Sequence, residues 1–247
     1  MSATKRLSSS RFGLAVGLML VIAVLALAGG SWVKGAEAGT IPTVPTLPTL
    51  PTVPTIPTFN DVPIDHTFFA EIESIYYYGI TLGCSTGPLL YCPDDLVIRA
   101  QMAAFIERGV NDPGFDPGTG TGLFSDVSTA EWGTFAGWIE LLYSEDITSG
   151  CATGPLRYCP SDPTLRNQMA VFLVRAKHGG SFVPPAATGV FSDVPLDGFF
   201  DRYIEQLYAD GITQGCATGP LRFCPTNTVT RGEMAAFLGR AFGIIPP

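Results

Sequence analysis

The sequence predicts a mainly helical fold made of three tandem helix-loop-helix repeats in a pseudo-threefold arrangement. The first observation behind this prediction is a segment, GCATGPLRYCP at residues 150–160, that recurs as GCSTGPLLYCP at 83–93 and as GCATGPLRFCP at 215–225. The second observation is that each copy is flanked on both sides by a stretch whose apolar residues recur at helical spacing. Because a unit this small rarely buries its apolar face alone, the three copies are expected to pack together.

The N-terminal segment, residues 1–38, has the organisation of an export signal. A basic start at residues 5–11 precedes an apolar run over 12–28, and a small-x-small cleavage sequence follows at 36–38. A second candidate cleavage sequence lies at 26–28. The apolar run is also long enough to serve as an uncleaved membrane anchor, so both alternatives remain open.

The chain is acidic, with a formal net charge of -8. Cleavage after Ala38 would remove four basic residues and one acidic residue and would shift the net charge to -11. Such a chain repels nucleic acid and anionic lipid surfaces, so we expect no nucleic-acid partner, and a membrane partner only if the signal is retained. After cleavage Lys177 is the one lysine left, and arginine supplies the other cations, which favours planar bidentate contacts.

A linker rich in proline and threonine follows at residues 39–58. Proline occupies every third position from Pro42 to Pro57, and this period matches the three residues per turn of polyproline II. At about 3.1 Å per residue the linker would be a semi-rigid spacer of roughly 60 Å. Its threonines suit an O-glycosylated stalk, and a plain disordered linker is the alternative.

The three repeats are expected at residues 59–110, 124–178 and 191–243, and each begins with an F-x-D-V sequence. Each first helix is expected to end at Gly79, Asp146 or Gly211, and each second helix to begin at an arginine. The second repeat has two extra residues near Trp132. The methionines of the second helices are expected to fill the core. They are Met102, Met169 and Met234.

All six cysteines lie in the repeated loops, and each loop has seven residues between its two cysteines. The pairs are Cys84 and Cys92, Cys151 and Cys159, and Cys216 and Cys224. An exported chain with an even cysteine count favours disulfides, and the repeat symmetry favours the three local pairings, each contributing roughly 2 to 3 kcal/mol. Zinc is disfavoured because the sequence has no CxxC pair and only two histidines, so no metal or cofactor is expected.

An arginine occupies the same place in all three repeats, at the expected start of the second helix. The three are Arg99, Arg166 and Arg231. A cation there faces the positive end of the helix dipole, which is unfavourable by a few tenths of a kcal/mol, so a compensating partner is expected. One alternative is a salt bridge to an acidic residue of the same repeat, such as Asp61, Asp126 or Asp193. The other is an anionic sugar group held by the guanidinium beside free helix-terminal amides.

Taken in order, these features resemble the S-layer homology domain: F-x-D-V, an aromatic helix start, an apolar helix, G-I, a loop ending in proline, and an arginine. The resemblance covers residues 59–243. It implies a three-pronged pseudo-trimer around a helical bundle that binds cell-wall polysaccharide, often pyruvylated, in grooves between repeats. The cysteine pair departs from the usual pattern and resembles an oxidised variant of that family.

The usual Thr-Arg-Ala-Glu signature of that family is incomplete here. In the third repeat, Thr230 and Glu233 keep the form of a capping box. The first two repeats read Ile-Arg-Ala-Gln and Leu-Arg-Asn-Gln at 98–101 and 165–168, without a hydroxyl cap. Arg231 is therefore expected to matter more for glycan binding than Arg99.

The resemblance implies a set of glycan-binding residues: Arg99, Arg166, Arg231, Asp61, Asp126, Asp193 and Trp132. For the aspartates, capping of the following segment or turn formation is the alternative. For Trp132, and for Phe68 and Phe199 near the other first-helix starts, burial in the core is the alternative.

The function expected from these observations is that of a secreted, non-catalytic protein of the bacterial cell surface that anchors itself or partners to the wall. No GxSxG, HExxH or P-loop sequence is present, and no catalytic residue is expected. A self-assembling surface-layer protein or a protein-protein adaptor is one alternative. A membrane-to-wall tether is the other, if the N-terminal segment is not cleaved.

Overall fold

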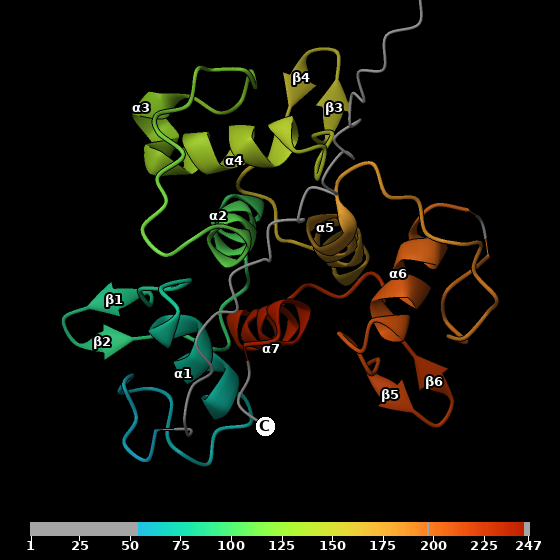
Figure 1. Cartoon of the computed structure of the whole chain (residues 1–247), viewed down its shortest axis with the longest axis horizontal. Coiled ribbons are helices and arrows are strands. Elements are labelled where there is room, and N and C mark those ends of the chain that lie inside the picture. Colours follow the sequence, from blue (N-terminus) through green and yellow to red (C-terminus); the bar gives the residue numbers. More distant parts are fainter. Residues whose placement is uncertain (1–53, 197, 245–247) are drawn as a thin grey trace, which may run out of the picture. The chain divides into compact units, whose positions relative to one another are not determined.

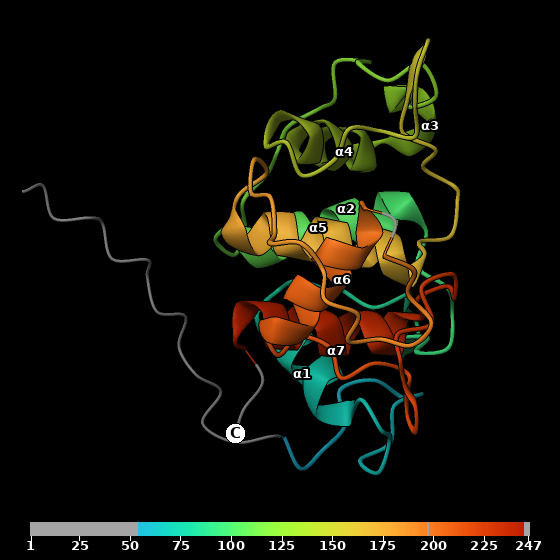
Figure 2. The ribbon, with the colours of Figure 1, turned by 90° about the vertical axis from the view of Figure 1, so that its right-hand side faces the viewer.

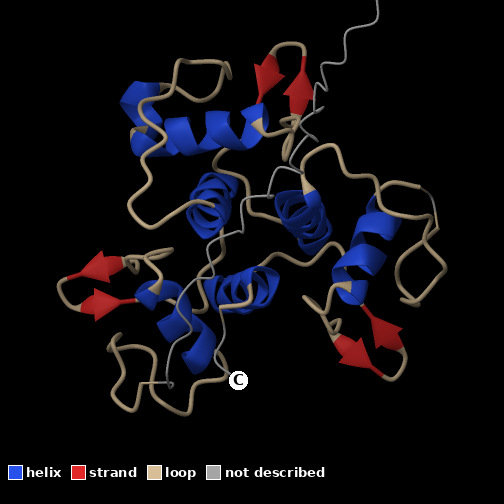
Figure 3. Cartoon of the chain, viewed as in Figure 1, coloured by secondary structure: helices blue, strands red, loops and turns tan. Residues whose placement is uncertain are grey.

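The computed structural model describes residues 54–196 and 198–244, which lie in one compact unit, and within them it is mainly helical with three small hairpins (Figures 1 and 3). The signal segment, and the linker up to residue 53, lie outside the described residues. The helices are α1 (Phe69–Tyr77), α2 (Arg99–Val110), α3 (Thr129–Trp132), α4 (Thr134–Ser144), α5 (Arg166–His178), α6 (Phe200–Ala209) and α7 (Arg231–Phe242). The strands are β1 (Ser85–Thr86), β2 (Leu89–Leu90), β3 (Ala152–Thr153), β4 (Leu156–Arg157), β5 (Ala217–Thr218) and β6 (Leu221–Arg222).

The first long helix of each repeat ends close to the expected position. Gly79 and Gly211, just beyond α1 and α6, have φ angles of 71° and 72°. Asp146 holds the same place after α4 with φ at 59°, a left-handed conformation that aspartate adopts more readily than most residues. Two of the three helix ends thus have glycine in the left-handed conformation, and the third has aspartate, which tolerates this conformation better than most side chains.

The second repeat has one helix more than the sequence predicted. Its two extra residues fall in the segment that forms α3, a single turn whose start is capped by the Ser128 hydroxyl, which accepts a hydrogen bond from the Glu131 amide at 3.3 Å. Gly133 follows with φ at 52° and separates α3 from α4. The insertion therefore places Trp132 on a short separate helix, outside the helix that packs into the core.

The second helices begin at the three arginines, as the sequence predicted. Their methionines are fully buried, which confirms the expected role as core residues. The capping box of the third repeat is complete, since Thr230 Oγ1 accepts from the Glu233 amide at 3.2 Å and Glu233 Oε2 accepts from the Thr230 amide at 3.0 Å. In the other two repeats only the glutamine half forms, from Gln101 and Gln168 to the N-cap amides, each at 3.3 Å.

The repeats share one core, because the second helix of each repeat packs against the first long helix of another. The pairs are α2 with α4, α5 with α6, and α7 with α1. In addition, α2, α5 and α7 contact one another pairwise, and Figures 1 and 2 show these three side by side with the partner helices outside them. No repeat could therefore keep its apolar residues buried if it were separated from the other two.

A ring of backbone hydrogen bonds joins the three segments that lead into the second helices. The Val97 amide donates to the Val229 carbonyl at 2.9 Å, the Val229 amide to the Thr164 carbonyl at 3.0 Å, and the Thr164 amide to the Val97 carbonyl at 2.8 Å. Each segment thus donates to one neighbour and accepts from the other. The three hydrogen bonds therefore form a closed cycle that links the three segments.

Each cysteine loop is a two-stranded hairpin, which the sequence did not predict. The paired strands are β1 with β2, β3 with β4, and β5 with β6. The three local disulfides form as expected, Cys84–Cys92, Cys151–Cys159 and Cys216–Cys224. Each disulfide therefore closes the base of one hairpin.

A glutamate on each first helix binds the segment that enters its repeat. Glu73 accepts from the amide and hydroxyl of Thr58, the last residue of the linker, at 2.8 and 2.6 Å. Glu140 accepts from the amides of three successive residues, 121–123, and Glu205 from those of 188–190. These carboxylates fix the path of the chain between repeats.

We expect Glu140→Gln to lower the free energy of unfolding by about 1 to 2 kcal/mol. The glutamine side chain has a single acceptor oxygen, whereas the donors of residues 121–123 now bind two carboxylate oxygens. Burial alone would raise the pKa of Glu140, but the bonds from Thr121, Leu123 and Gly122 outweigh it and lower the pKa. This stabilisation is therefore present above the ordinary glutamate pKa and is lost as the pH falls through the lower pKa of the folded state. Urea unfolding at pH 7 and pH 4 measures it, with exposed Glu131→Gln as control. Equal losses for both variants would contradict the assignment.

Candidate functional site

The three arginines at the helix starts are buried, with 4%, 5% and 4% of Arg99, Arg166 and Arg231 exposed. Each donates through Nε to a backbone carbonyl in the cysteine loop of another repeat. The bonds are Arg99 to the Tyr158 carbonyl at 2.8 Å, Arg166 to the Phe223 carbonyl at 2.9 Å, and Arg231 to the Tyr91 carbonyl at 2.7 Å. The arginines therefore clasp neighbouring repeats together.

Each guanidinium also lies over two aromatic rings. The pairs of rings are Tyr158 and Phe172 for Arg99, Phe223 and Phe237 for Arg166, and Tyr91 and Phe105 for Arg231, at 4.6 to 5.4 Å from the ring centres. In two cases the ring returns a hydrogen bond, from the Tyr91 hydroxyl to the Arg231 carbonyl at 2.6 Å and from the Tyr158 hydroxyl to the Arg99 carbonyl at 2.8 Å. Carbonyl and ring contacts of this kind stabilise a cation in a place that the helix dipole disfavours.

Two expectations about these helix starts are corrected by the structure. Within residues 54–196 and 198–244, no ion pair joins the arginines to the F-x-D-V aspartates. Nor are the first amides of the second helices free. The Arg99 amide donates to the Asp162 carbonyl at 2.9 Å and the Ala100 amide to the Pro160 carbonyl at 3.0 Å, and α5 and α7 repeat the pattern. A ligand would thus meet the guanidinium and not the helix-terminal amides.

The F-x-D-V aspartates hold the turn at the second cysteine of each loop, about 30 residues further along the chain. Asp61 accepts from the amides of Tyr91 and Cys92 at 2.8 and 2.7 Å, and Asp126 and Asp193 make the same pair of bonds. Cys92 there has φ at 58°. Turn formation, one of the two roles expected for these aspartates, is therefore the role that the structure shows. The turn that they stabilise lies in the cysteine loop and not in the segment directly after the aspartate.

Asp126 and Asp193 each have an additional cationic partner in the same hairpin. Arg157 lies 3.4 Å from Asp126 and Arg222 lies 3.6 Å from Asp193, with both arginines about half exposed. Burial alone would raise the pKa of Asp193, but the amides of Phe223 and Cys224, with Arg222, lower it. Asp193 therefore remains ionised at neutral pH, and the carboxylate of each aspartate lies close to both cysteine sulfurs of its own hairpin. Because those sulfurs are in disulfides, they cannot act as thiolate metal ligands.

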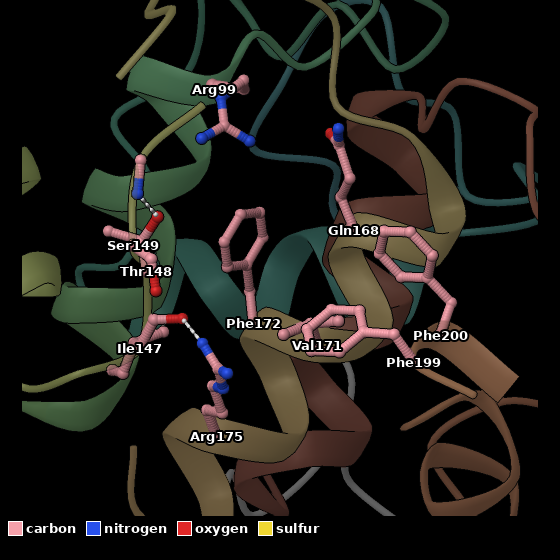
Figure 4. Close-up of a pocket in the computed structure, with 11 residues that line it drawn as sticks. Arg99, Ile147, Thr148, Ser149, Gln168, Val171, Phe172, Arg175, Phe199 and Phe200 are labelled. Carbon is pink, nitrogen blue, oxygen red and sulfur yellow. Dashed lines mark hydrogen bonds between the residues drawn. The ribbon is translucent and has the colours of Figure 1, made fainter. Parts of the chain in front are cut away.

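Arg99 lines a pocket of about 260 Å³ to which all three repeats contribute (Figure 4). Its other lining residues come from the loop after α4 (147–150), from α5 and from the start of α6. Arg175 is the second cation, Phe199 and Phe200 are exposed at 49% and 36%, and none of the described lining residues is acidic. The pocket is thus electropositive in a chain whose net charge is negative.

The Arg99 side chain is not fully satisfied by the protein. Its Nη2 atom is buried and has no hydrogen-bond partner among the described residues, whereas Nε is bound to the Tyr158 carbonyl. Figure 4 shows the guanidinium at one end of the pocket, above the ring of Phe172. Because a buried donor left unpaired costs about 1 to 3 kcal/mol, an acceptor from a ligand would be favourable at this position.

Trp132 lies in a different hollow, of about 490 Å³, formed within the second repeat. It is half-buried there beside Asp126, Arg157 and Glu131. In the described part of the chain, its indole nitrogen is buried and lacks an acceptor. Two of the residues that the sequence predicted to bind glycan, Trp132 and Asp126, therefore line the same hollow. This hollow shares no lining residue with the Arg99 pocket.

The expectation of core burial fails for Phe199, which is half exposed and lines the Arg99 pocket. Phe68 is half-buried and packs against the core.

A second set of arginines also recurs at one position in all three repeats, and the sequence pattern did not predict a role for them. Arg108, Arg175 and Arg240 lie nine residues after the helix-start arginines and donate to the carbonyls of Ile80, Ile147 and Ile212 at 3.5, 3.2 and 3.4 Å. Their presence at the same place in all three repeats was the available signal. A cation in the last turn of a helix is favoured by the helix dipole, so the dipole alone accounts for an arginine at this position and indicates no binding role.

Residues 190–235 match the family model of the S-layer homology domain. This match lies almost entirely in the third repeat, which contains α6, the hairpin of β5 and β6, and the start of α7. The S-layer homology domain is a non-catalytic family that binds the cell wall, so the match indicates association with the cell wall or cell surface. The first two repeats lie outside the S-layer homology match but share its disulfide-closed hairpin and its aspartate contacts.

The search of curated proteins gave no match. Over the described residues, the structure contains no helix with the length and apolar character needed to cross a membrane.

Proposed function

We propose that this protein binds an acidic cell-wall polysaccharide through three repeats like the S-layer homology domain, and thereby anchors itself or a partner at the cell wall. The observation that supports this proposal most is the pocket lined by Arg99 and Arg175 with no acidic residue among its described lining. An electropositive hollow is unexpected in a chain of net charge -8, unless it receives an anion.

The side chains of this pocket suit a sugar that bears a carboxylate. The unpaired Nη2 of Arg99 would donate to a carboxylate oxygen, a charge-assisted bond stronger than one between neutral groups. The exposed rings of Phe199 and Phe200 offer apolar surface for the sugar ring. A pyruvate ketal or a uronic acid would combine both features.

The Trp132 hollow is proposed as a second contact for the same polymer. An indole ring with a free nitrogen donor, next to carboxylates that accept from hydroxyl groups, fits a neutral sugar residue. The carboxylates of Asp126 and Glu131 would repel an acidic one. A polymer that alternates acidic and neutral residues would engage both hollows.

A pseudo-threefold arrangement of the repeats is part of this proposal. It is supported by the cyclic helix pairing and by the ring of hydrogen bonds through Val97, Thr164 and Val229. Such an arrangement would place one arginine clasp at each of the three junctions between repeats.

Sedimentation with purified cell-wall sacculi tests the proposed function. We expect the protein to pellet with untreated sacculi and to stay in solution after the acidic polymer has been removed chemically. Negligible pelleting in both samples would overturn the proposal.

A self-assembling or adaptor role is the second candidate, and one surface feature favours it. Leu82 and Phe115 are exposed at 64% and 42% and line a hollow of about 320 Å³ with Trp138. Adjacent apolar side chains of this kind are common at protein interfaces. Concentration-dependent oligomers in light scattering would favour this candidate over a monomeric glycan binder. A membrane tether would instead require that mature protein retain residues 1–38, which N-terminal sequencing determines.

A further inference from the structure

We infer that the Trp132 hollow binds a primary ammonium group that has an oxygen atom on the next carbon. Free amino sugars and amino acids with an unmodified α-amine both contain this arrangement. The hollow has a volume of about 490 Å³, and Trp132 lines it together with Asp126, Glu131, Arg157 and Asp162. An ammonium ligand is more specific than the uncharged sugar of the proposed function, and its binding does not require a cell-wall role.

The lining of this hollow carries more negative than positive charge. The carboxylates of Asp126, Glu131 and Asp162 contribute to it, against the single guanidinium of Arg157. This guanidinium lies 3.4 Å from Asp126, whose two oxygens also accept from two backbone amides of the hairpin, at 2.9 and 2.8 Å. Because Arg157 and Asp126 pair with each other, the other two carboxylates are the ones left to bind a cation.

The carboxylates of Glu131 and Asp162 have no partner within the protein. Both residues are exposed, and over residues 54–196 and 198–244 neither side chain forms an ion pair or accepts a hydrogen bond. The same ranges contain a single lysine, Lys177, and its Nζ donates to the Ala241 carbonyl at 3.1 Å. An ammonium group for these two carboxylates would therefore come from a ligand.

Trp132 adds two contacts that suit the same ligand. An indole ring attracts a cation placed over its face more strongly than other aromatic rings do. The Nε1 atom of Trp132 is buried and has no acceptor among the described residues, so an oxygen of the ligand would satisfy it. The need for this acceptor favours an amino sugar or an α-amino group over a simple alkylammonium ion.

The second repeat alone combines these groups. Glu131 and Trp132 belong to α3, and no counterpart of this helix is described in the other two repeats. The place of Asp162 is taken by Asn227 in the third repeat, and the place of Arg157 by Leu90 in the first. The disulfide-closed hairpin is common to all three repeats, so an ammonium site is expected once, beside the insertion.

Four small molecules test the inference: glucosamine, alaninamide, glucose and N-acetylglucosamine. Each is titrated into the purified protein at pH 6, where free amines are protonated, and followed by NMR at the Trp132 indole N–H and the Cys159 amide. We expect saturable shifts with glucosamine, alaninamide or both, and none with the two uncharged sugars. The Cys224 amide, which donates to Asp193 as that of Cys159 does to Asp126, is the internal control and should not respond.

The double variant Glu131→Gln with Asp162→Asn removes both unpaired carboxylates and nearly keeps their shape. Asparagine is accepted at the second place, because Asn227 occupies it in the third repeat. The Asn227 carbonyl accepts from the Arg166 amide just as the Asp162 carbonyl accepts from the Arg99 amide, each at 2.9 Å. We expect the double variant to bind the ammonium probe at least about tenfold more weakly than wild type.

Asp65→Asn with Asp94→Asn is the matched control, because it removes two exposed carboxylates of the first repeat that do not line the hollow. The net charge changes equally in both double variants, so the control should keep the wild-type affinity. Equal shifts with glucosamine and glucose, tighter binding of Ca²⁺ than of either amine, or equal affinities in the two double variants would overturn the inference. Thermal unfolding shows whether the variants keep the fold.

The proposed function can fail separately from the ammonium site. Glucosamine binding that Glu131→Gln with Asp162→Asn weakens, together with failure to pellet with sacculi, would leave the ammonium site and remove the cell-wall role. Normal pelleting, with the same response to glucose as to glucosamine, would do the reverse.

Discussion

Replacing Arg166 by alanine is expected to lower the free energy of unfolding by about 3 kcal/mol. The side chain is 5% exposed and bridges two repeats, so its removal takes away the bond to the Phe223 carbonyl and the contacts with two rings. It also leaves Glu233 without its cation. Urea unfolding of the oxidised protein, followed by circular dichroism, measures the change.

Arg157→Ala is the matched control for this prediction. Arg157 also forms an ion pair with a carboxylate, that of Asp126, but it is about half exposed. Pairs of this kind contribute about 0 to 1 kcal/mol, because water solvates both charges when the pair is broken. If the two variants lose the same stability, Arg166 is not an internal clasp.

The sequence predicted the starts of the second helices, the disulfide pairing and the stops of the first helices, because each depends on residues close together in the chain. It could not predict what compensates the helix-start arginines. The Arg99 guanidinium is separated from its carbonyl partner by 59 residues, and that of Arg231 by 140. Both bonds exist because the repeats pair cyclically, a long-range choice that helical periodicity does not encode.

The aspartates illustrate the same limit. An aspartate shortly before a helix suggests capping of that helix, since capping is the usual local solution. Asp61 instead accepts from the amides of residues 91 and 92, where the left-handed Cys92 forms the turn. The sequence showed that the residue was required in every repeat, but only the folded hairpin shows what requires it.

Raising the pH from 5 to 9 is expected to destabilise the protein by on the order of 3 kcal/mol through Glu107. This α2 side chain is fully buried at the contact of α2 with α4, and one of its oxygens has no partner among the described residues. Burial, reinforced by the negative charge of Glu145, raises its pKa from 4.5 to about 8, against the opposing hydrogen bond from Asn111.

The direction of the pH effect follows from that pKa. Between pH 4.5 and pH 8 the folded protein holds a proton on Glu107 that the unfolded chain releases, so the stabilisation is complete at low pH and is lost as the pH rises through 8. Urea unfolding at pH 5, 7 and 9 measures this loss. The other repeats have valine and glycine at the corresponding places, 174 and 239, so the effect belongs to the first junction alone.

Glu107→Gln separates this cause from other titrations. The amide has nearly the same shape and does not ionise, so the variant is expected to lose most of the decline in stability between pH 5 and pH 9 and to be more stable than wild type at pH 9. Glu145→Gln, at the exposed end of α4, is the control. It removes a neighbouring negative charge that raises the pKa of Glu107 while leaving Glu107 able to ionise, so the decline should persist and shift to slightly lower pH. A decline that Glu107→Gln leaves intact would place the titrating group elsewhere in the molecule.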